Sequence, residues 1–467
     1  MSELASGPAE PAPGPAQSNP AQPDLVQPDL VQPDLVQPDL VQPAPARPVP
    51  ATGAVGAVAP GRGDAAVDPR LLFAGPGLRG LADSALRHVR AGELGSLPVI
   101  VGLVVIWTIF QFQNSNFLTS YNLTNLALQV AATGTIATGV FLVLLLGEID
   151  LSVGWVSGLC ASVMAVLSVR HGWAPVLAIV AALVVGAAVG ALQGSLFAVF
   201  GVPSFVVTLA GFIAWQGVQL KVLGRDGSLN LPDSEITKLT STFFTDATGW
   251  VIAGIAVAGY AGAQLAEVRG RRRAGLRPRP ITEVAVRVVV VGGALLAAVA
   301  VLNDDRGLPL ALLIFGCLVL LVDLVSRRTS YGRHLYAVGG NVEAARRAGI
   351  NVRALRVSAF AAASCLAGVG GVLAAARLTS VTQASGGSDT LLNAIAAAVI
   401  GGTSLFGGRG RAWSALLGIL VIGSIANGMD LLGLDQSVKF IITGSVLLAA
   451  VLLDAVARRG RQASGRG

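Results

Sequence analysis

The chain has 467 residues, of which 53% are apolar and 13% are charged, and its mean hydropathy is +0.69. Soluble domains carry about 25% charged residues, so this chain has too few polar groups to cover a water-facing surface. The charge is also uneven, since residues 1–96 carry a net −4 and the remainder a net +11, which gives the total of +7. This composition excludes an ordinary soluble protein and indicates an integral membrane protein with a polar tail.

The tail, residues 1–96, is rich in Pro, Ala and Gly and contains four tandem Gln-Pro-Asp-Leu-Val units from Gln22 to Val41. A proline every fifth residue prevents a helix, and one apolar pair per unit cannot build a core. We expect a disordered cytoplasmic segment that serves either as an extended tether or as a docking motif for a partner.

From Leu97 onward the chain consists of apolar runs near the ~20 residues that a helix needs to cross a bilayer. They show no period-2 alternation, so helices are predicted rather than a barrel. The predicted fold is an all-α polytopic bundle of about 10–12 spans over residues 97–457, with some runs as half-spans and a basic tail at 458–467. The runs lie at about 97–113, 125–146, 151–169, 174–200, 203–222, 250–265, 284–302, 308–325, 357–376, 391–406, 412–428 and 438–454.

The basic residues predict the orientation of the bundle. With a cytoplasmic N-terminus, the loops placed inside contain 19 Lys and Arg and the loops placed outside contain 5. The positive-inside rule therefore puts both termini in the cytoplasm, and the longest outer loop, 224–249, becomes an extracytoplasmic cap. The pI of about 9.9 reflects these short loops, so no nucleic-acid partner is expected.

A first candidate segment joins two apolar runs with almost no loop and carries Glu148, Asp150, Ser152 and Gly154. Carboxylates at a membrane boundary are costly unless they are paired, hydrated or bound to a helix end. Asp150 or Ser152 is suited to cap the following helix. The alternative is a role in gating or in lining a substrate path.

A second candidate segment is rich in glycine and includes Gly401, Gly402 and Thr403. Four glycines within positions 401–408 predict a helix break in apolar surroundings, which membrane proteins tolerate where backbone is buried or lines a cavity. Interrupted segments of this kind often mark a transporter's substrate region. Close packing of helices through small residues is the other interpretation.

The third candidate segment lies in the most basic inner loop, 326–356. Asn341 is a good N-cap, Glu343 suits the first turn, and Gly349 suits the position after the last turn. This pattern predicts a short, charged helix held between two spans, able to transmit force to a soluble partner. An ordinary amphipathic surface loop is the alternative.

The sequence contains no feature that points to chemistry on this chain. It has no Gly-x-x-x-x-Gly-Lys-Ser/Thr motif, no proton-relay series and no nucleophile–base set. Its three cysteines are far apart and have no His at ligand spacing, so neither a disulfide nor a metal site is expected. We therefore expect a non-enzymatic protein without a cofactor of its own. Amide side chains within the spans, such as Gln129, Gln193, Gln216 and Asn393, suit either hydrogen bonding within the core or the lining of a path for a polar molecule.

At these segments the sequence resembles the permease subunits of bacterial ABC-type monosaccharide importers, the ribose/galactose/xylose family, and within it the D-xylose type. The resemblance spans about 360 residues in family order. The segments that carry it are 148–154, 202–211, 337–352, 399–410 and 427–429.

The resemblance implies a multi-pass subunit of the cell inner membrane that moves a monosaccharide inward, with D-xylose the best match and ribose, galactose or another small ligand as alternatives. It implies a second permease copy, a cytosolic ATPase that holds ATP and Mg²⁺, and an extracytoplasmic sugar-binding protein as partners. The residues it assigns to coupling with the ATPase are Gly340, Asn341, Glu343, Ala344, Ala345 and Gly349. Those it suggests for the path or its gate are Glu148, Asp150, Ser152, Gly154, Gly401, Gly402 and Thr403, beside the amide Asn393.

Two other classes stay open. A secondary sugar transporter needs an ion-coupling site, which the sequence does not show, and its uptake would survive an inactive ATPase. A membrane scaffold would explain the long tail, and it would fail when residues 1–90 are deleted.

Overall fold

The computed structural model describes residues 97–276 and 280–463, and the segment with the Gln-Pro-Asp-Leu-Val units lies outside them. Short helical turns occur at Val166–Arg170, a π turn, and at Gly224–Asp226, a 3-10 turn. The strands are β1 (Ser228–Asn230), β2 (Phe243–Phe244), β3 (Leu308–Pro309) and β4 (Ser380–Thr382). The helices are α2 (Leu97–Gln113), α3 (Ser120–Leu145), α4 (Val153–Ala165), α5 (Pro175–Phe200), α6 (Ser204–Leu223), α7 (Glu235–Ser241), α8 (Asp246–Arg273), α9 (Ile281–Asn303), α10 (Leu310–Arg328), α11 (Ser330–Gly340), α12 (Val342–Arg347), α13 (Val352–Leu378), α14 (Ser388–Ile400), α15 (Ala412–Leu431) and α16 (Gln436–Ala463).

Each of the twelve apolar runs coincides with a helix, which confirms the predicted helical membrane fold. Among the described residues, nine helices are long and apolar enough to cross a bilayer. The other three apolar helices are shorter: α2, α14 and the apolar part of α16, Gln436–Ala449. The run at 391–406 ends early as helix, because the glycine-rich segment after Ile400 leaves the helical conformation.

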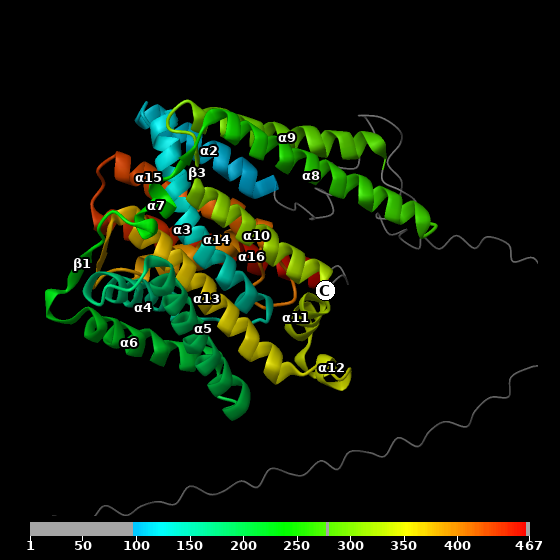
Figure 1. The fold of residues 1–467 in the computed structure, drawn as a ribbon. Helices are drawn as coiled ribbons and strands as arrows, with labels where there is room; N and C mark the ends of the chain where they lie inside the picture. Colours follow the sequence, from blue (N-terminus) through cyan, green and yellow to red (C-terminus); the bar gives the residue numbers. More distant parts are fainter. Residues whose placement is uncertain (1–96, 277–279, 464–467) are drawn as a thin grey trace, which may run out of the picture. The chain divides into compact units, whose positions relative to one another are not determined.

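Helix α13 lies at the centre of the bundle and packs against α3, α4 and α5 (Figure 1). Its contact with α5 depends on Gly186, Gly190 and Gly194, which share one face of that helix because they are four residues apart. A Cβ at Gly190 would overlap the carbonyl oxygen of Phe360, and one at Gly194 would lie 2.9 Å from Cα of Val357. The two backbones therefore touch directly, as small residues permit in membrane helices.

The contact between α3 and α13 has the same character. A Cβ at Gly139 would lie 2.6 Å from the carbonyl oxygen of Ala363, and one at Gly370 would lie 2.7 Å from that of Ala132. Glycines thus hold α3, α5 and α13 together as one closely packed unit.

A second closely packed pair is formed by α14 and α15. A Cβ at Gly401 would overlap the carbonyl oxygen of Ser414, and one at Gly418 would overlap that of Ala397. This pair meets α3 through side chains, since a Cβ at Gly423 would meet the Val130 side chain at 2.9 Å.

The segment 224–249, predicted as a cap, contains α7 and two short strands. β1 pairs antiparallel with β4 in the register Ser228↔Thr382, and β2 pairs antiparallel with β3 in the register Phe244↔Leu308. α7 begins with a capping box at Ser234 and packs against α13. The cap therefore ties the sequence-distant ends of α6, α9 and α13 together. The strands were not predicted, because runs of two or three residues carry no readable period.

Helices α8 and α9 pair with each other and lie beside the rest of the bundle (Figure 1). Most of their apolar side chains are exposed, among them Ile255, Val289 and Val290. Apolar side chains on such a pair need no protein partner where lipid covers them.

The glycine contacts make a prediction about stability. In Gly190→Ala the new Cβ meets the Phe360 carbonyl, so we expect the free energy of unfolding to fall by roughly 1–3 kcal/mol. The matched variant is Gly217→Ala on α6, where nothing lies within 4 Å of an added Cβ. It should be neutral or slightly stabilising, by about 0.5–1 kcal/mol, because alanine favours helix. Thermal unfolding of the purified, detergent-solubilised protein measures both, and equal behaviour of the two variants would contradict the packing argument.

Candidate functional site

Two adjoining cavities lie between α3, α13 and α15. The smaller, here called the polar pocket, has a volume of about 250 Å³, and the larger, the wide pocket, has about 750 Å³. They share part of their walls, including Gln129 and Arg377. Five polar side chains line the polar pocket: Gln129, Thr133, Arg377, Asn393 and Asp430.

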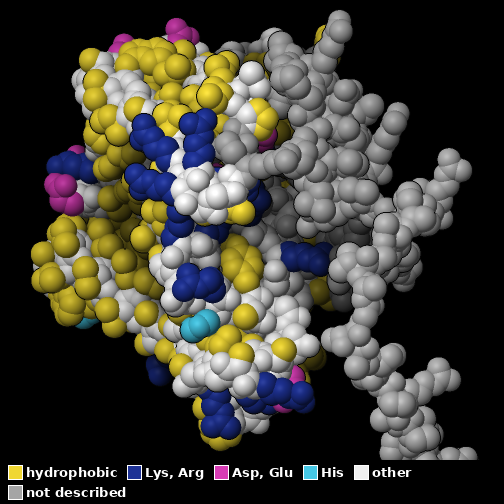
Figure 2. All heavy atoms as spheres, turned by 90° about the vertical axis from the view of Figure 1, so that its right-hand side faces the viewer, with side chains coloured by type: hydrophobic (Ala, Val, Ile, Leu, Met, Phe, Trp, Pro, Cys, Tyr) yellow, Lys and Arg dark blue, Asp and Glu magenta, His cyan; other side chains and the backbone are white. Residues whose placement is uncertain are grey.

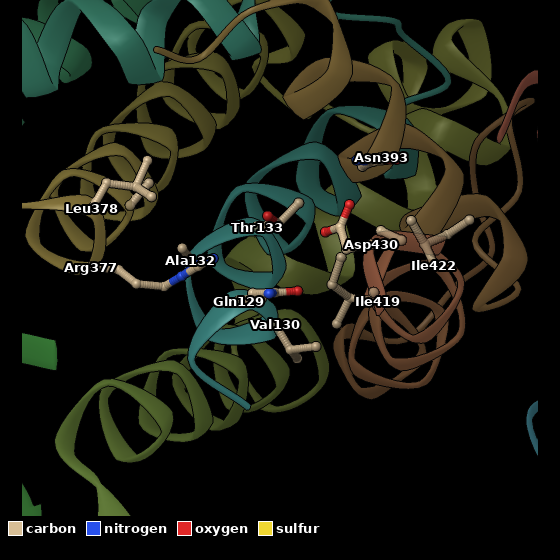
Figure 3. Close-up of a pocket in the computed structure, with 13 residues that line it drawn as sticks. Gln129, Val130, Ala132, Thr133, Arg377, Leu378, Asn393, Ile419, Ile422 and Asp430 are labelled. Carbon is tan, nitrogen blue, oxygen red and sulfur yellow. The ribbon is translucent and has the colours of Figure 1, made fainter. Parts of the chain in front are cut away.

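The helices bring these five side chains together from distant parts of the sequence (Figure 3). Gln129 and Thr133 are four residues apart on α3 and so project from the same face. Arg377 lies in the last turn of α13, and Asp430 lies in the last turn of α15. Figure 3 shows Arg377 on one side of the pocket and Asp430 on the other, with the α3 residues between them.

Four of these side chains have no hydrogen-bonding partner in the part of the chain that the structure describes: Gln129, Thr133, Arg377 and Asn393. An unpaired polar group in an apolar setting costs free energy unless water or a ligand satisfies it. Their convergence on one cavity is therefore typical of a site that binds a polar molecule.

Other polar side chains buried in the bundle behave differently. Asn122 and Asn427 exchange hydrogen bonds of 2.8 Å and 3.1 Å between α3 and α15. Gln193 on α5 donates to Ser152 at 2.9 Å. On α3 itself, the Thr135 hydroxyl bonds back to the carbonyl four residues earlier. Single buried atoms elsewhere, such as Ser364 Oγ and Trp215 Nε1, also have no partner among the described residues, whereas the polar pocket brings four unpartnered side chains together.

Asn393 lines the pocket from the second turn of the short helix α14, whose first residues, Ser388 and Asp389, are exposed. The turn before it packs onto α4, where a Cβ at Gly154 would lie 2.6 Å from the carbonyl oxygen of Gly386. Gly386 has φ +74°, which glycine adopts without strain. Non-helical backbone at membrane depth is tolerated where protein covers it or where it lines a cavity. The sequence predicted an interruption only after this helix, at 401–408, and did not predict the turn before it.

The opposite end of the bundle is rich in arginine, and we call it the arginine-rich end. Figure 2 shows Lys and Arg side chains gathered on this face of the molecule. Three helices end there with arginines in their last turns, namely α8 with Arg271, Arg272 and Arg273, α10 with Arg327 and Arg328, and α12 with Arg346 and Arg347.

At this end α12 is the short capped helix that the sequence predicted. The Asn341 side chain accepts a hydrogen bond of 2.9 Å from the Ala344 amide, and Gly349 follows the last turn with φ +82°. Ala345 is buried in the main core, whereas Glu343 is exposed and pairs with Arg346 at 3.0 Å. The helix is therefore anchored on one side and presents charge on the other.

Glycines connect α12 to the rest of the bundle. Gly339, near the end of α11, has room only for hydrogen where it meets the carbonyl oxygen of Leu145. The Gly408 amide donates to the same oxygen at 2.9 Å, and a Cβ on Gly407 would lie 2.7 Å from the Gly147 nitrogen. We call this three-way contact the glycine junction. It lets the α3–α4 loop, the end of α11 and the glycine-rich segment meet backbone to backbone.

Glu148, directly after the junction, ties four helices together. It accepts a hydrogen bond of 2.7 Å from Ser204 at the start of α6 and forms an ion pair of 3.1 Å with Arg356 on α13. The Arg356 guanidinium lies 4.2 Å from the ring centre of Phe197 on α5. Burial raises the pKa of Glu148, while the Ser204 hydrogen bond and Arg356 act to lower it. With side chains only 16% and 18% exposed, the pair is a structural connection between α3, α5, α6 and α13.

Asp150 and Ser152 lie at the start of α4. The Asp150 carboxylate accepts from the Ser152 amide at 2.8 Å and from its hydroxyl at 2.7 Å. Burial raises the Asp150 pKa, and these two hydrogen bonds oppose that shift. The arrangement favours the helix-end interpretation for Asp150, whereas the Ser152 hydroxyl points to Asp150 and Gln193 rather than capping the helix.

The glycine-rich segment ends α14. Gly402 has φ +98°, its amide donates to Val399, and the Thr403 amide donates to Ala398. This is a helix C-terminus closed by a glycine. Gly401 provides close contact with α15, and Thr403 is buried.

Of the eight residues suggested for the path or gate, Asn393 lines the polar pocket. Glu148, Asp150, Ser152, Gly154, Gly401, Gly402 and Thr403 line neither pocket and lie in helix ends and backbone contacts. Gln129, noted among the amides, lines both pockets. Sequence reasoning missed Thr133, Arg377 and Asp430. A lone Arg and a lone Asp at the ends of two apolar runs were the available signal.

The Glu148–Arg356 pair makes a second prediction. Glu148→Ala leaves a mostly buried guanidinium unpaired, so we expect the free energy of unfolding to fall by roughly 2–4 kcal/mol. Glu343→Ala removes one partner of an exposed pair and should change it by no more than about 0.5 kcal/mol. Thermal unfolding in detergent compares the two. If Glu148→Ala unfolds at the same temperature as Glu343→Ala, the pair is not a structural connection.

Comparison with known proteins identifies the family. Residues 122–451 match the model described as "Branched-chain amino acid transport system / permease component". The chain is 35% identical over 363 residues to the xylose transport system permease protein of Escherichia coli K12, covering 77% of this chain and 92% of that protein. The corresponding protein of Haemophilus influenzae is 35% identical over 364 residues, covering 77% and 96%.

The ribose import permease protein of Escherichia coli K12 is 31% identical over 372 residues, covering 79% of this chain and 97% of that protein. No solved structure matches the chain. The family match covers more than half of the chain, and its helices are those of a multi-pass protein of the inner membrane. The chain is therefore a transport subunit rather than an enzyme, and it belongs to the family of permease components of transport systems that this model describes.

Proposed function

We propose that this chain is the membrane-spanning subunit of an ATP-driven importer that carries D-xylose, or a closely related monosaccharide, into the cell. The observation that carries the proposal is the set of unpartnered polar side chains on one pocket within the bundle. A sugar hydroxyl both donates and accepts hydrogen bonds, so amides, a threonine and an arginine all provide partners for it. The similarity to xylose and ribose permeases supports the same class of substrate.

The orientation follows from charge. We place the arginine-rich end in the cytoplasm, because basic residues favour that side. The pockets then lie toward the extracytoplasmic side, since Arg377 follows the start of α13 by 25 residues, or on the order of 40 Å of helix. A binding protein on that side would deliver the sugar to the wide pocket first.

The proposed partners are a cytosolic ATPase, the binding protein and a second copy of this chain. ATP and Mg²⁺ would be held by the ATPase, which matches the absence of a phosphate-binding loop in this sequence. We assign the contact with the ATPase to α12 and its caps, comprising Gly340, Asn341, Glu343, Ala344, Ala345 and Gly349. The glycine junction and Glu148 would pass movement of α12 to α3, α6 and α13, so the residues around them belong to the gate rather than to the sugar-binding wall.

Uptake of labelled D-xylose tests this function. Cells that lack the chain should regain uptake when it is expressed with its ATPase and binding protein, and unlabelled xylose should compete best. Competition by ribose or galactose alone would keep the transport class and replace the sugar. An absence of any monosaccharide uptake, with all subunits present in the membrane, would refute the proposal. Uptake that survives an inactive ATPase would instead indicate a secondary transporter.

A charge reversal tests the role of α12. Glu343→Arg removes the ion pairs with Arg346 and Arg347 at the exposed face, so we expect ATPase association and sugar uptake to fall by about tenfold or more. The matched control is Glu235→Arg on α7, which breaks a similar exposed pair with Lys238 at the other end of the bundle. Co-purification of the ATPase with each variant gives the readout. Equal recovery with both variants would remove α12 from the ATPase contact.

A further inference from the structure

Arg377 occupies an unusual position for a charged residue. It lies in the last turn of a membrane-spanning helix, and its side chain is part of the walls of both pockets. No hydrogen bond or ion pair holds it within the described residues. A charge inside a span is costly and as a rule has a partner or a function. The guanidinium offers five N–H donors from a wall that the two cavities share.

Asp430 is the acidic group that faces it. Its charge acts on Arg377, and Figure 3 shows the two side chains on opposite sides of the α3 wall. Lys439 on α16 donates to Asp430 Oδ1 at 2.6 Å, which fixes the carboxylate and leaves Oδ2 as an acceptor. Arg377 and Asp430 therefore lie across the pocket from each other, and no salt bridge between them is formed in the described residues.

The third charged group on the pocket walls, like Asp430, has an ion-pair partner. Arg306, in the wide pocket, pairs with Asp305 at 2.9 Å and donates to Asn125 at 3.1 Å. The walls of the polar pocket thus carry one cation and one anion, Arg377 and Asp430, beside neutral amides and a hydroxyl. A neutral molecule rich in hydroxyls can accept from Arg377 and donate to Asp430 at once. Asp430 would repel a carboxylate or a phosphate, and Arg377 would repel a protonated amine.

We propose that Arg377 and Asp430 form a two-sided binding site in the polar pocket that selects a neutral polyol. This inference rests on the proposed function, and it names the residues that would set the substrate class. Arg377 donates to the hydroxyl oxygens of the passing molecule, while Asp430 accepts from its hydroxyl groups. Asp430, although it is paired with Lys439, also places a negative charge on the wall opposite the arginine, which repels an anion bound at Arg377.

The experiment uses the full transporter, with its ATPase and binding protein, in proteoliposomes. With saturating sugar-loaded binding protein, Arg377→Gln should transport about tenfold less D-xylose per ATP hydrolysed, because its charged donors are lost. Arg377→Lys keeps the charge but loses the planar guanidinium, so its xylose transport per ATP should lie between that of the wild type and that of Arg377→Gln. The matched control, Arg225→Gln, changes an exposed arginine in the cap that lines neither pocket and should leave transport unchanged.

A second arm tests the charge balance with the sugar acid D-xylonate as the probe. Asp430→Asn removes the acidic group from the wall of the polar pocket and leaves Arg377 and Lys439 without a counter-charge, so millimolar D-xylonate should inhibit xylose transport in this variant and not in the wild type. Adding Arg377→Gln to Asp430→Asn should abolish that inhibition. Inhibition of the wild type, or insensitivity of Asp430→Asn, would overturn the selection against anions.

The outcomes separate this inference from the function itself. A wild type that transports no monosaccharide refutes the proposed function. A wild type that transports xylose while Arg377→Gln and Arg377→Lys both transport within about twofold of it refutes the binding site alone. Elution of each variant as the assembled complex in size-exclusion chromatography shows that a loss reflects transport rather than misfolding.

Discussion

The constraint on which the structure depends is that a bilayer offers no partner to a polar group, so the protein must provide one or leave the group facing water or a ligand. Most of the bundle meets it through backbone bonded within helices and through amides bonded to each other, as Asn122 and Asn427 do. The polar pocket departs from this pattern, because four of its polar side chains are unpartnered. Single buried atoms elsewhere are unpartnered as well, but four such side chains on one cavity are typical of a site that binds a polar molecule.

The same constraint explains the many glycines. A helix that must pack closely against another without a hydrophobic driving force gains from direct backbone contact, which small residues allow. Gly190 against Phe360 and Gly139 against Ala363 fix α3, α5 and α13 as one unit. Gly401 and Gly418 fix α14 and α15 as another. Between the units, Gly423 meets the side chain of Val130, which can adjust more readily than backbone, and the pockets lie along this boundary.

Features with a local signal were predictable from the sequence, and those that depend on contacts between distant segments were not. Each apolar run is a helix in the structure, because backbone in a bilayer has to form its hydrogen bonds within the segment, and an apolar run can be recognised from the sequence alone. Asn341 and Gly349 were recognised as caps, because capping depends on neighbours three or four residues away. The pocket required Thr133, Arg377 and Asp430 to be brought together by three helices, and no period in the sequence reports that register. Glu148 drew attention as a carboxylate at a membrane boundary, yet its partner Arg356 lies 208 positions further along the chain.

The pocket and the capped helix lie at opposite ends of the same two helices. α13 follows α12 after a link of four residues and carries Arg377 in its last turn, while α3 carries Gln129 near one end and leads to Glu148 at the other. Because glycine contacts join α3 and α13 along their length, the two helices are poorly suited to bend or separate. Under the proposed function, a displacement of α12 would therefore tilt them as one body against α14 and α15. Such a tilt moves Arg377 relative to Asp430, the two charges across the pocket. It therefore changes the affinity for a bound molecule, although the same residues contact that molecule before and after the tilt.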